Sequence, residues 1–226
     1  MSLMSFQSDA LRITMEDTGV MMSRFHELFL TAGFLLLMSG CAPSATRGPG
    51  DRADSPSSWN TETLAALQYS SEVTVHHEPQ GRVQVELSSA WAENGVLIVR
   101  GVFTPDDPDF HLYSCTLPTQ GIQGLGRPTR IDVANPKEFT QIGVLLADEK
   151  IIEISDDVLG LTFPVYPDGP VTLYLPLRLG TNTEPSEPVS LKLTYMACSK
   201  QNCHRPYEGA LVKIKPPPRP SSDSAA

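Results

Sequence analysis

The segment from Val189 to Pro206 reads VSLKLTYMACSKQNCHRP and decides how this chain is expected to fold. Its first half alternates apolar and polar residues, so every second side chain from residue 191 to residue 195 faces the same side of a β-strand. Its second half places Cys198 and Cys203 on either side of four polar residues. The segment therefore predicts a strand with one buried face, followed by a turn that has a thiol on each side.

Similar strand-like segments recur along most of the chain, each bounded by Gly, Pro, Asn or Asp. They cover residues 82–88, 96–103, 110–115, 129–133, 141–146, 150–154, 171–179, 189–197 and 210–215. No helical pattern lies between them, and we expect Trp91, in the loop-like stretch before Gly95, to be a packing residue. Many short strands separated by turn residues predict an all-β fold, an immunoglobulin-like antiparallel β-sandwich.

The segments at both ends of this region have a different composition. Residues 42–80 begin with Pro, Ser, Gly and charged residues, which predicts a flexible tether, with a possible short helix over 61–69. Residues 216–226 begin with three prolines and predict a disordered tail that joins no sheet. The expected folded domain therefore extends from residue 81 to residue 215.

Upstream of the tether, residues 29–38 form an apolar stretch of signal-peptide length. This stretch is too short to span a bilayer comfortably. The following Ser39-Gly40-Cys41 resembles a bacterial lipobox, whose cysteine is lipidated and becomes the first residue after cleavage. An ordinary cleaved signal and an uncleaved anchor are the alternatives.

We accordingly expect residues 21–41 to be a signal peptide with a lipobox and residues 1–20 to be a non-native or disordered extension. A lipid on Cys41 would hold the protein at the periplasmic face of the bacterial cell envelope. The formal net charge is −9 and the basic residues are scattered, which argues against a nucleic-acid partner because nucleic acid requires a concentrated positive face.

The spacing of Cys198 and Cys203 requires the chain to turn back between them if they are bonded. Five extended steps would separate their Cα atoms by roughly 16 Å, whereas a disulfide needs about 4.4 to 6.8 Å. A disulfide that closes so small a loop contributes only about 2 kcal/mol to stability on the chain-entropy estimate. A structural disulfide, a metal site and a redox couple all remain open at this point. Cys115 has no obvious partner and is expected to be a buried apolar residue.

Three motifs between residues 81 and 215 resemble the N-terminal periplasmic domain of the thiol:disulfide interchange protein DsbD. They are FHLY at 110–113, GRPTRI at 126–131, and Tyr195-x-x-Cys198 followed by Cys203 and Pro206. The resemblance implies an immunoglobulin-like domain that transfers electrons and uses no cofactor. It identifies the chain as a stand-alone version of that domain, expected to be a lipoprotein.

In that family the cysteine equivalent to Cys203 forms mixed disulfides and the one equivalent to Cys198 resolves them. The resemblance implies an oxidoreductase-type exchange with thioredoxin-like redox proteins, and we expect the membrane electron carrier to be supplied by another chain. It also implies a cap loop over the cysteines, which we assign to residues 156–166 although their sequence departs from the usual cap. The supporting residues that it suggests are His111, Tyr113, Phe163, Tyr166 and Tyr195.

Two other functions fit the same residues. A Cys-x4-Cys-His cluster suits Cu(I) or Zn(II), but a closed site would need His111, Cys115 or the pair His76-His77 to converge on it. Adjacent histidines on a strand face opposite sides, so His76 and His77 are not expected to act together. The other alternative is an interaction module with a structural disulfide. Lys200 and His204 could favour a thiolate at the pair or could be solvated.

The lipobox predicts that mass spectrometry of the mature protein will find Cys41 as a lipid-modified first residue. Cys41→Ser should abolish the modification and release the protein from the membrane, whereas Cys115→Ser should change neither. An unmodified first residue downstream of Cys41 would instead identify an ordinary secreted protein.

Overall fold

The computed structural model describes residues 59–92, 95–184 and 186–220. The expected extension 1–20, the signal peptide 21–41 with Cys41, the tether up to residue 58 and the last six residues of the tail lie outside the described residues. Within the described residues, no helix has both the length and the apolar character needed to cross a membrane.

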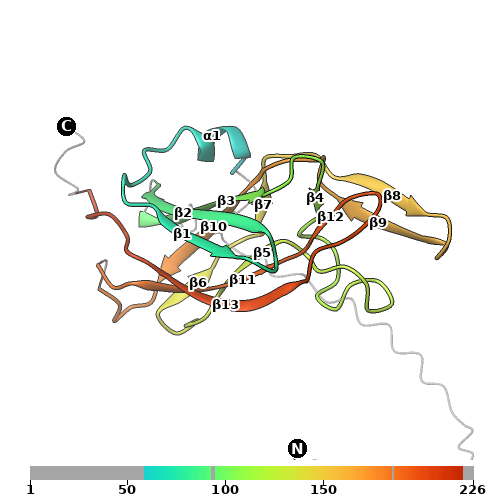
Figure 1. The fold of residues 1–226 in the computed structure, drawn as a ribbon. Coiled ribbons are helices and arrows are strands. Elements are labelled where there is room, and N and C mark those ends of the chain that lie inside the picture. Colours follow the sequence, from blue (N-terminus) through green and yellow to red (C-terminus); the bar gives the residue numbers. More distant parts are fainter. Residues whose placement is uncertain (1–58, 93–94, 185, 221–226) are drawn as a thin grey trace, which may run out of the picture. The chain divides into compact units, whose positions relative to one another are not determined.

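Two antiparallel sheets form the body of the domain (Figure 1). The first sheet has the order β1 (Thr74–Glu78), β2 (Val83–Trp91), β3 (Leu97–Pro105), β10 (Val171–Leu179) and β6 (Phe139–Gln141), and β7 (Leu146–Ala147) also pairs with β10. The second sheet has the order β13 (Tyr207–Ile214), β11 (Val189–Tyr195) and β5 (Arg130–Val133). This is the immunoglobulin-like β-sandwich that the strand pattern predicts.

The main core lies between these sheets and is built by the predicted alternation. In β2, Val83, Val85 and Leu87 are buried, and in β11 every second residue from Val189 to Tyr195 is buried. Gly101 on β3 permits the close approach of the sheets, because a Cβ atom there would lie 2.6 Å from Cδ1 of Ile131 on β5.

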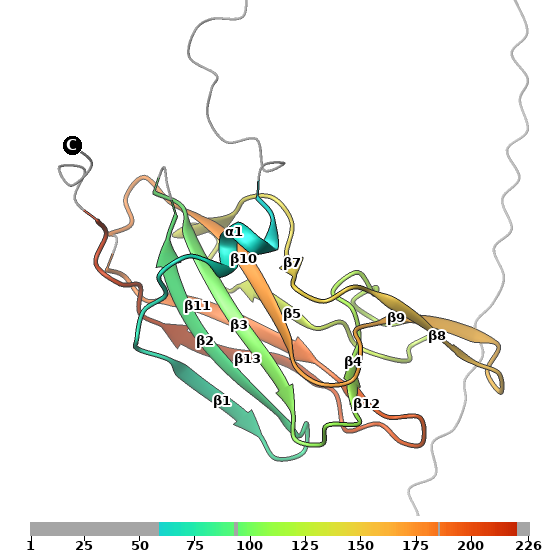
Figure 2. The same ribbon diagram turned by 90° about the horizontal axis from the view of Figure 1, so that it is seen from above.

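The central strands of the first sheet are also buried on their outer face. The short helix α1 (Thr61–Ala65) covers that face, where Leu64 packs with Ile98 of β3 and Tyr174 of β10. Figure 2 shows α1 lying over these strands. Coverage on both faces explains why β3 and β10 contain nearly continuous apolar runs rather than a strict alternation.

The folded domain extends beyond both of its predicted boundaries, residue 81 and residue 215. Residues 74–78, expected to belong to the tether, form β1 and pair with β2. Only alternate residues of β1 are partly buried and its centre is His76-His77, so its apolar pattern is too weak to identify from the sequence. At the other end, the Trp91 indole N–H donates a 2.7 Å hydrogen bond to the carbonyl oxygen of Pro217, so the start of the predicted tail packs against β2.

Two of the expected strands are interrupted near the cysteines, because their residues pair outside the two main sheets. The expected strand 189–197 divides into β11 and β12 (Ala197–Cys198), and the expected strand 110–115 is reduced to β4 (His111–Leu112). β12 pairs with β4 in a separate two-stranded sheet, and β8 (Ile152–Asp156) pairs with β9 (Leu161–Val165) in another. Figure 2 shows both small sheets at the same end of the sandwich.

A matched pair of leucine substitutions tests this core. Leu193 on β11 is completely buried between the sheets, so Leu193→Ala should lower the free energy of unfolding by about 2 to 5 kcal/mol. Leu211 on the neighbouring β13 is 70% exposed, and Leu211→Ala should change that free energy by less than about 0.5 kcal/mol. Chemical denaturation of both variants measures the difference, and equal effects would contradict the described packing.

Candidate functional site

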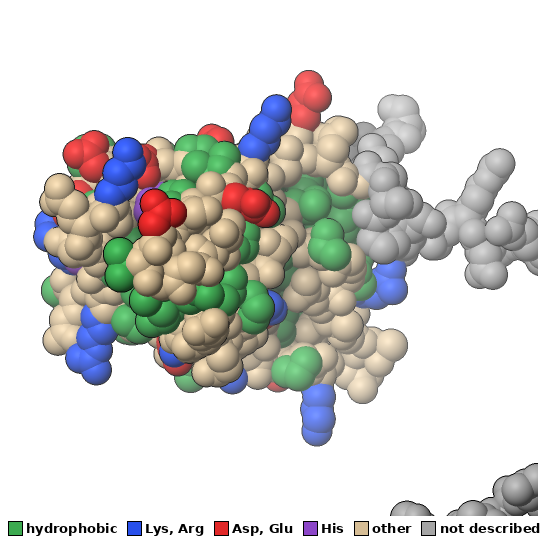
Figure 3. All heavy atoms as spheres, turned by 90° about the vertical axis from the view of Figure 1, so that its right-hand side faces the viewer, with side chains coloured by type: hydrophobic (Ala, Val, Ile, Leu, Met, Phe, Trp, Pro, Cys, Tyr) green, Lys and Arg blue, Asp and Glu red, His purple; other side chains and the backbone are tan. Residues whose placement is uncertain are grey.

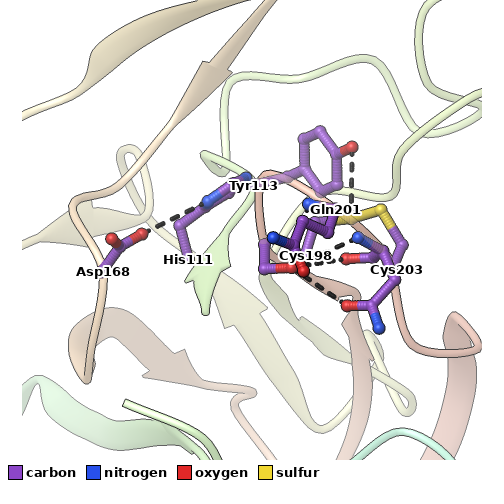
Figure 4. The surroundings of a disulfide bond; sticks show 8 residues. His111, Tyr113, Asp168, Cys198, Gln201 and Cys203 are labelled. Carbon is purple, nitrogen blue, oxygen red and sulfur yellow. Dashed lines mark hydrogen bonds and ion pairs between the residues drawn. A yellow bond between two sulfur atoms is a disulfide. The ribbon is translucent and has the colours of Figure 1, made fainter. Parts of the chain in front are cut away.

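Cys198 and Cys203 form a disulfide at the end of the sandwich, with their Cα atoms 4.0 Å apart (Figure 4). This Cα distance is slightly shorter than the usual range for a disulfide, and the pair has the tight turn that a bond between these residues requires. The chain reverses direction between them: the Ser199 N–H donates to the Asn202 carbonyl at 2.8 Å, and the His204 N–H donates to the Ala197 carbonyl at 2.9 Å. We call residues 197–204 the disulfide hairpin.

The turn of the disulfide hairpin has hydrogen bonds that do not depend on the sulfur atoms. The hydroxyl oxygen of Ser199 accepts the N–H groups of Gln201 and Asn202, each at 3.2 Å, and the hydroxyl donates to the Asn202 side-chain oxygen at 3.0 Å. Local side-chain to backbone bonds of this kind stabilise a turn without any crosslink. The hairpin therefore has a means of keeping its shape when the disulfide is reduced.

The two cysteines differ strongly in exposure. Cys198 is 2% exposed and packs in a small apolar cluster with Tyr113, Phe163 and Val165, whereas Cys203 is exposed to solvent. A thiolate opens a disulfide by attacking one sulfur while the other leaves. An incoming thiolate has access to Cys203, and Cys198 would be the leaving group.

The Tyr113 hydroxyl donates a hydrogen bond to the sulfur of Cys198 at 3.4 Å. The residue is held in place by its carbonyl oxygen, which accepts bonds from both the N–H and the hydroxyl of Thr129, and by a bridge to Val165. Burial raises the pKa of Tyr113, and the Asp156 carboxylate raises it further. The hydroxyl thus remains protonated at neutral pH and can donate to a thiolate at Cys198.

His111 lies opposite Cys198 in the β4–β12 pair. Its Nδ1 atom is 3.4 Å from the Asp168 carboxylate. Burial lowers the pKa of His111, while the charge and the hydrogen bond of Asp168 oppose that change. Figure 4 shows Tyr113 next to the sulfur atoms and the His111–Asp168 pair farther away.

The other expected supporting residues divide between the disulfide and the main core. Phe163 on β9 packs edge-on against Tyr113, with the ring centroids 5.7 Å apart. Tyr166 and Tyr195 are completely buried in the main core, outside the apolar cluster that contains Cys198. The Tyr166 hydroxyl accepts the N–H of Cys115 at 3.1 Å. Of the two expected supporting residues in the cap segment, Phe163 therefore belongs to the disulfide cluster and Tyr166 does not.

The expected cap segment, residues 156–166, forms the turn and second strand of the β8–β9 hairpin. The turn residues Val158 and Leu159 are 94% and 51% exposed. Figure 3 shows this end of the domain, where hydrophobic side chains gather with acidic side chains among them. Exposed apolar surface of this kind is typical of a protein–protein contact. No pattern in the sequence marks these two residues as exposed.

The residues considered for a metal site do not come together. Among the described residues, no group of three or more His, Cys, Asp or Glu side chains could hold a metal ion. His76 packs on Tyr207 and His77 pairs with Asp106, so the two face opposite sides of β1 as expected. Cys115 is a free thiol and is only partly buried, which differs from the expected full burial.

Two solved structures are similar to this chain. One is the N-terminal domain of DsbD from Neisseria meningitidis in the reduced form, at 18% identity and a TM-score of 0.39, covering 62% of this chain and 89% of that one. The other is the N-terminal periplasmic domain of ScsB from Proteus mirabilis, at 16% identity and a TM-score of 0.37, covering 62% of this chain and 48% of that one. No protein-family model and no curated protein sequence matches the chain. We therefore base the proposed function on this chain's own residues.

The Tyr113 hydroxyl should accelerate opening of the disulfide, because it can stabilise the thiolate that leaves at Cys198. A hydrogen bond to a charged group contributes about 1.5 kcal/mol or more, so Tyr113→Phe should slow reduction by dithiothreitol about tenfold. Tyr174→Phe is the matched control, since Tyr174 is a buried tyrosine in the separate cluster under α1. Stopped-flow measurements that give equal rates for both variants would exclude this role for Tyr113.

Proposed function

We propose that this domain carries out thiol:disulfide exchange, passing electrons through Cys198 and Cys203 between a thioredoxin-like donor and oxidised proteins of the bacterial envelope. The observation that carries the proposal is the asymmetry of the pair: Cys203 is exposed, and Cys198 is buried beside a hydroxyl that can donate to its sulfur. A purely structural disulfide requires neither feature.

In the first half-reaction, a thiolate of the donor attacks the sulfur of Cys203. The Cys198–Cys203 bond breaks, a mixed disulfide forms between the donor and Cys203, and Cys198 leaves as a thiolate stabilised by Tyr113. The second thiol of the donor then attacks the mixed disulfide. The donor departs oxidised, and the domain retains two electrons and two protons as a pair of thiols.

The second half-reaction runs the same steps on an oxidised target. The Cys203 thiolate attacks a disulfide of the target, and one target sulfur leaves as a thiolate. Cys198 then attacks Cys203, which restores the internal disulfide and releases the target with both of its sulfurs reduced. Every step is a sulfur-to-sulfur displacement, so the chemistry needs no cofactor.

The cellular setting of the proposal comes from the sequence. A signal peptide with a lipobox would place the domain at the periplasmic face, held to the membrane by a lipid on Cys41, with residues beyond it as a tether. The electrons would reach the domain from a membrane carrier on another chain. The exposed apolar turn at Val158 and Leu159 supports contact with a protein partner at this end of the domain.

Trapping variants test the assigned roles. In a Cys115→Ser background, which removes the free thiol, Cys198→Ser should leave Cys203 able to form a lasting mixed disulfide with a thioredoxin-like donor. Cys203→Ser should give less than about a tenth as much adduct, because Cys198 is buried and thiol exchange depends on access. Gel analysis without reductant measures both adducts.

Equal trapping by the two variants, or trapping through Cys198 alone, would overturn the roles given to the cysteines. If neither variant forms a mixed disulfide, and the Cys198–Cys203 bond of the native protein also resists dithiothreitol, the domain would be an interaction module with a structural disulfide.

A further inference from the structure

We propose that His204 is a positioning residue that holds Cys203 in place for exchange, and that it holds Cys203 more firmly when its ring is protonated. This inference rests on the proposed function of the same disulfide. His204 follows Cys203 directly, and its N–H donates to the carbonyl of Ala197, which closes the disulfide hairpin. Neighbouring residues on an extended segment face opposite sides, so the imidazole lies away from the sulfur of Cys203.

On that opposite side, the His204 ring is stacked on Phe110. The ring centroids are 4.3 Å apart and the rings are nearly parallel, at 5°. Phe110 is 8% exposed and belongs to the main core between the sheets. The stack therefore ties the segment that carries the exposed cysteine to the rigid part of the domain.

The far edge of the same ring faces a carboxylate. His204 Nε2 is 3.6 Å from Asp107 Oδ2, within ion-pair range but too long for a hydrogen bond. This nitrogen is buried and has no hydrogen-bond partner among the described residues. A neutral ring leaves Nε2 unsatisfied, whereas a protonated ring gains the attraction of Asp107. Protonation of His204 should therefore strengthen the attachment of the hairpin to the segment that carries Asp107 and Phe110.

Other charged groups surround this contact and limit its strength. Arg82 also pairs with Asp107, at 3.2 Å, and with Asp106, at 3.7 Å. Other charged groups on the elements nearby include His77, which pairs with Asp106; Arg205, which donates to Gln80; and His111 and Asp168, which pair across from Cys198. Asp109, between Asp107 and Phe110, and Lys200, in the turn of the hairpin, are both exposed. Asp107 is 40% exposed, so the expected effect of its pairing with His204 is modest.

Reduction of the disulfide makes this attachment important. Once the covalent bond is broken, the turn hydrogen bonds and the His204 contacts keep the two thiols close together. In the dithiol, Cys203 is no longer bonded to Cys198, so the end of the hairpin has more freedom to move away from Phe110 and Asp107. The disulfide removes that freedom, so formation of the disulfide and protonation of His204 favour each other. The disulfide should therefore become more stable, relative to the dithiol, when His204 gains a proton at lower pH.

An equilibrium with glutathione isolates this effect. One protein disulfide and two glutathione thiols give one protein dithiol and one glutathione disulfide, so no net proton is consumed while all thiols are protonated. The full chain in the Cys115→Ser background should favour the disulfide about threefold more at pH 5.5 than at pH 7. His204→Phe keeps a ring for stacking but cannot be protonated, and it should lose this pH dependence.

Two further variants and a matched control complete the experiment. Asp107→Asn should also remove the pH dependence, and His204→Ala should make the disulfide easier to reduce at both pH values because it loses the stack as well. His77→Phe removes the comparable histidine–aspartate pair on β1 and should keep the native pH dependence.

A pH dependence that persists in His204→Phe, or that His77→Phe or His111→Phe abolishes instead, would overturn the inference. The measurement uses glutathione alone, so it is independent of the trapping of a protein donor. If His204→Phe loses the pH dependence of the disulfide equilibrium, the positioning role is supported even if no donor is trapped. If a donor is trapped but the native chain shows no pH dependence, the positioning role is overturned and the proposed function stands.

Discussion

The pairing of β12 with β4 is the constraint on which the candidate site depends. β11 belongs to the second sheet, but beyond Tyr195 the chain leaves that sheet and pairs with β4, which follows β3 of the first sheet. This places Cys198 beside Tyr113 and beneath the β8–β9 hairpin, rather than on the open edge of a sheet. The buried position of one cysteine and the exposed position of the other both follow from it.

Most of the stability of the domain comes from its main core and not from the disulfide, which suits a disulfide that opens and closes. The main core is built from residues of both large sheets and does not include Cys198 or Cys203. A disulfide across a loop this small adds only about 2 kcal/mol on the entropy estimate, which is about what the burial of one large apolar side chain contributes. Reduction should therefore leave the sandwich folded, and the bonds of Ser199 should keep the turn of the hairpin formed.

The fold places different residues beside each of the two cysteines. Cys198 has a hydroxyl donor, Tyr113, which suits a sulfur that must leave as a thiolate. Cys203 has no comparable donor among the described residues, and its neighbour His204 binds to the core through Phe110. The contrast fits a division of roles in which Cys203 meets the partner and Cys198 closes the internal disulfide.

The sequence by itself determined the β-sandwich, through the period-two alternation of strands such as β2 and β11, and it determined that a bond between Cys198 and Cys203 needs a tight turn, because only four polar residues separate them. The sequence did not reveal β1. It also grouped Tyr166 with the disulfide, because local patterns do not show which core a buried aromatic residue joins. Only the tertiary structure decided that Cys203 is the exposed cysteine, that Tyr113 contacts the sulfur and that His204 lies between Phe110 and Asp107. These contacts join residues far apart in the chain, and their geometry depends on how β4, β9 and β12 pack together.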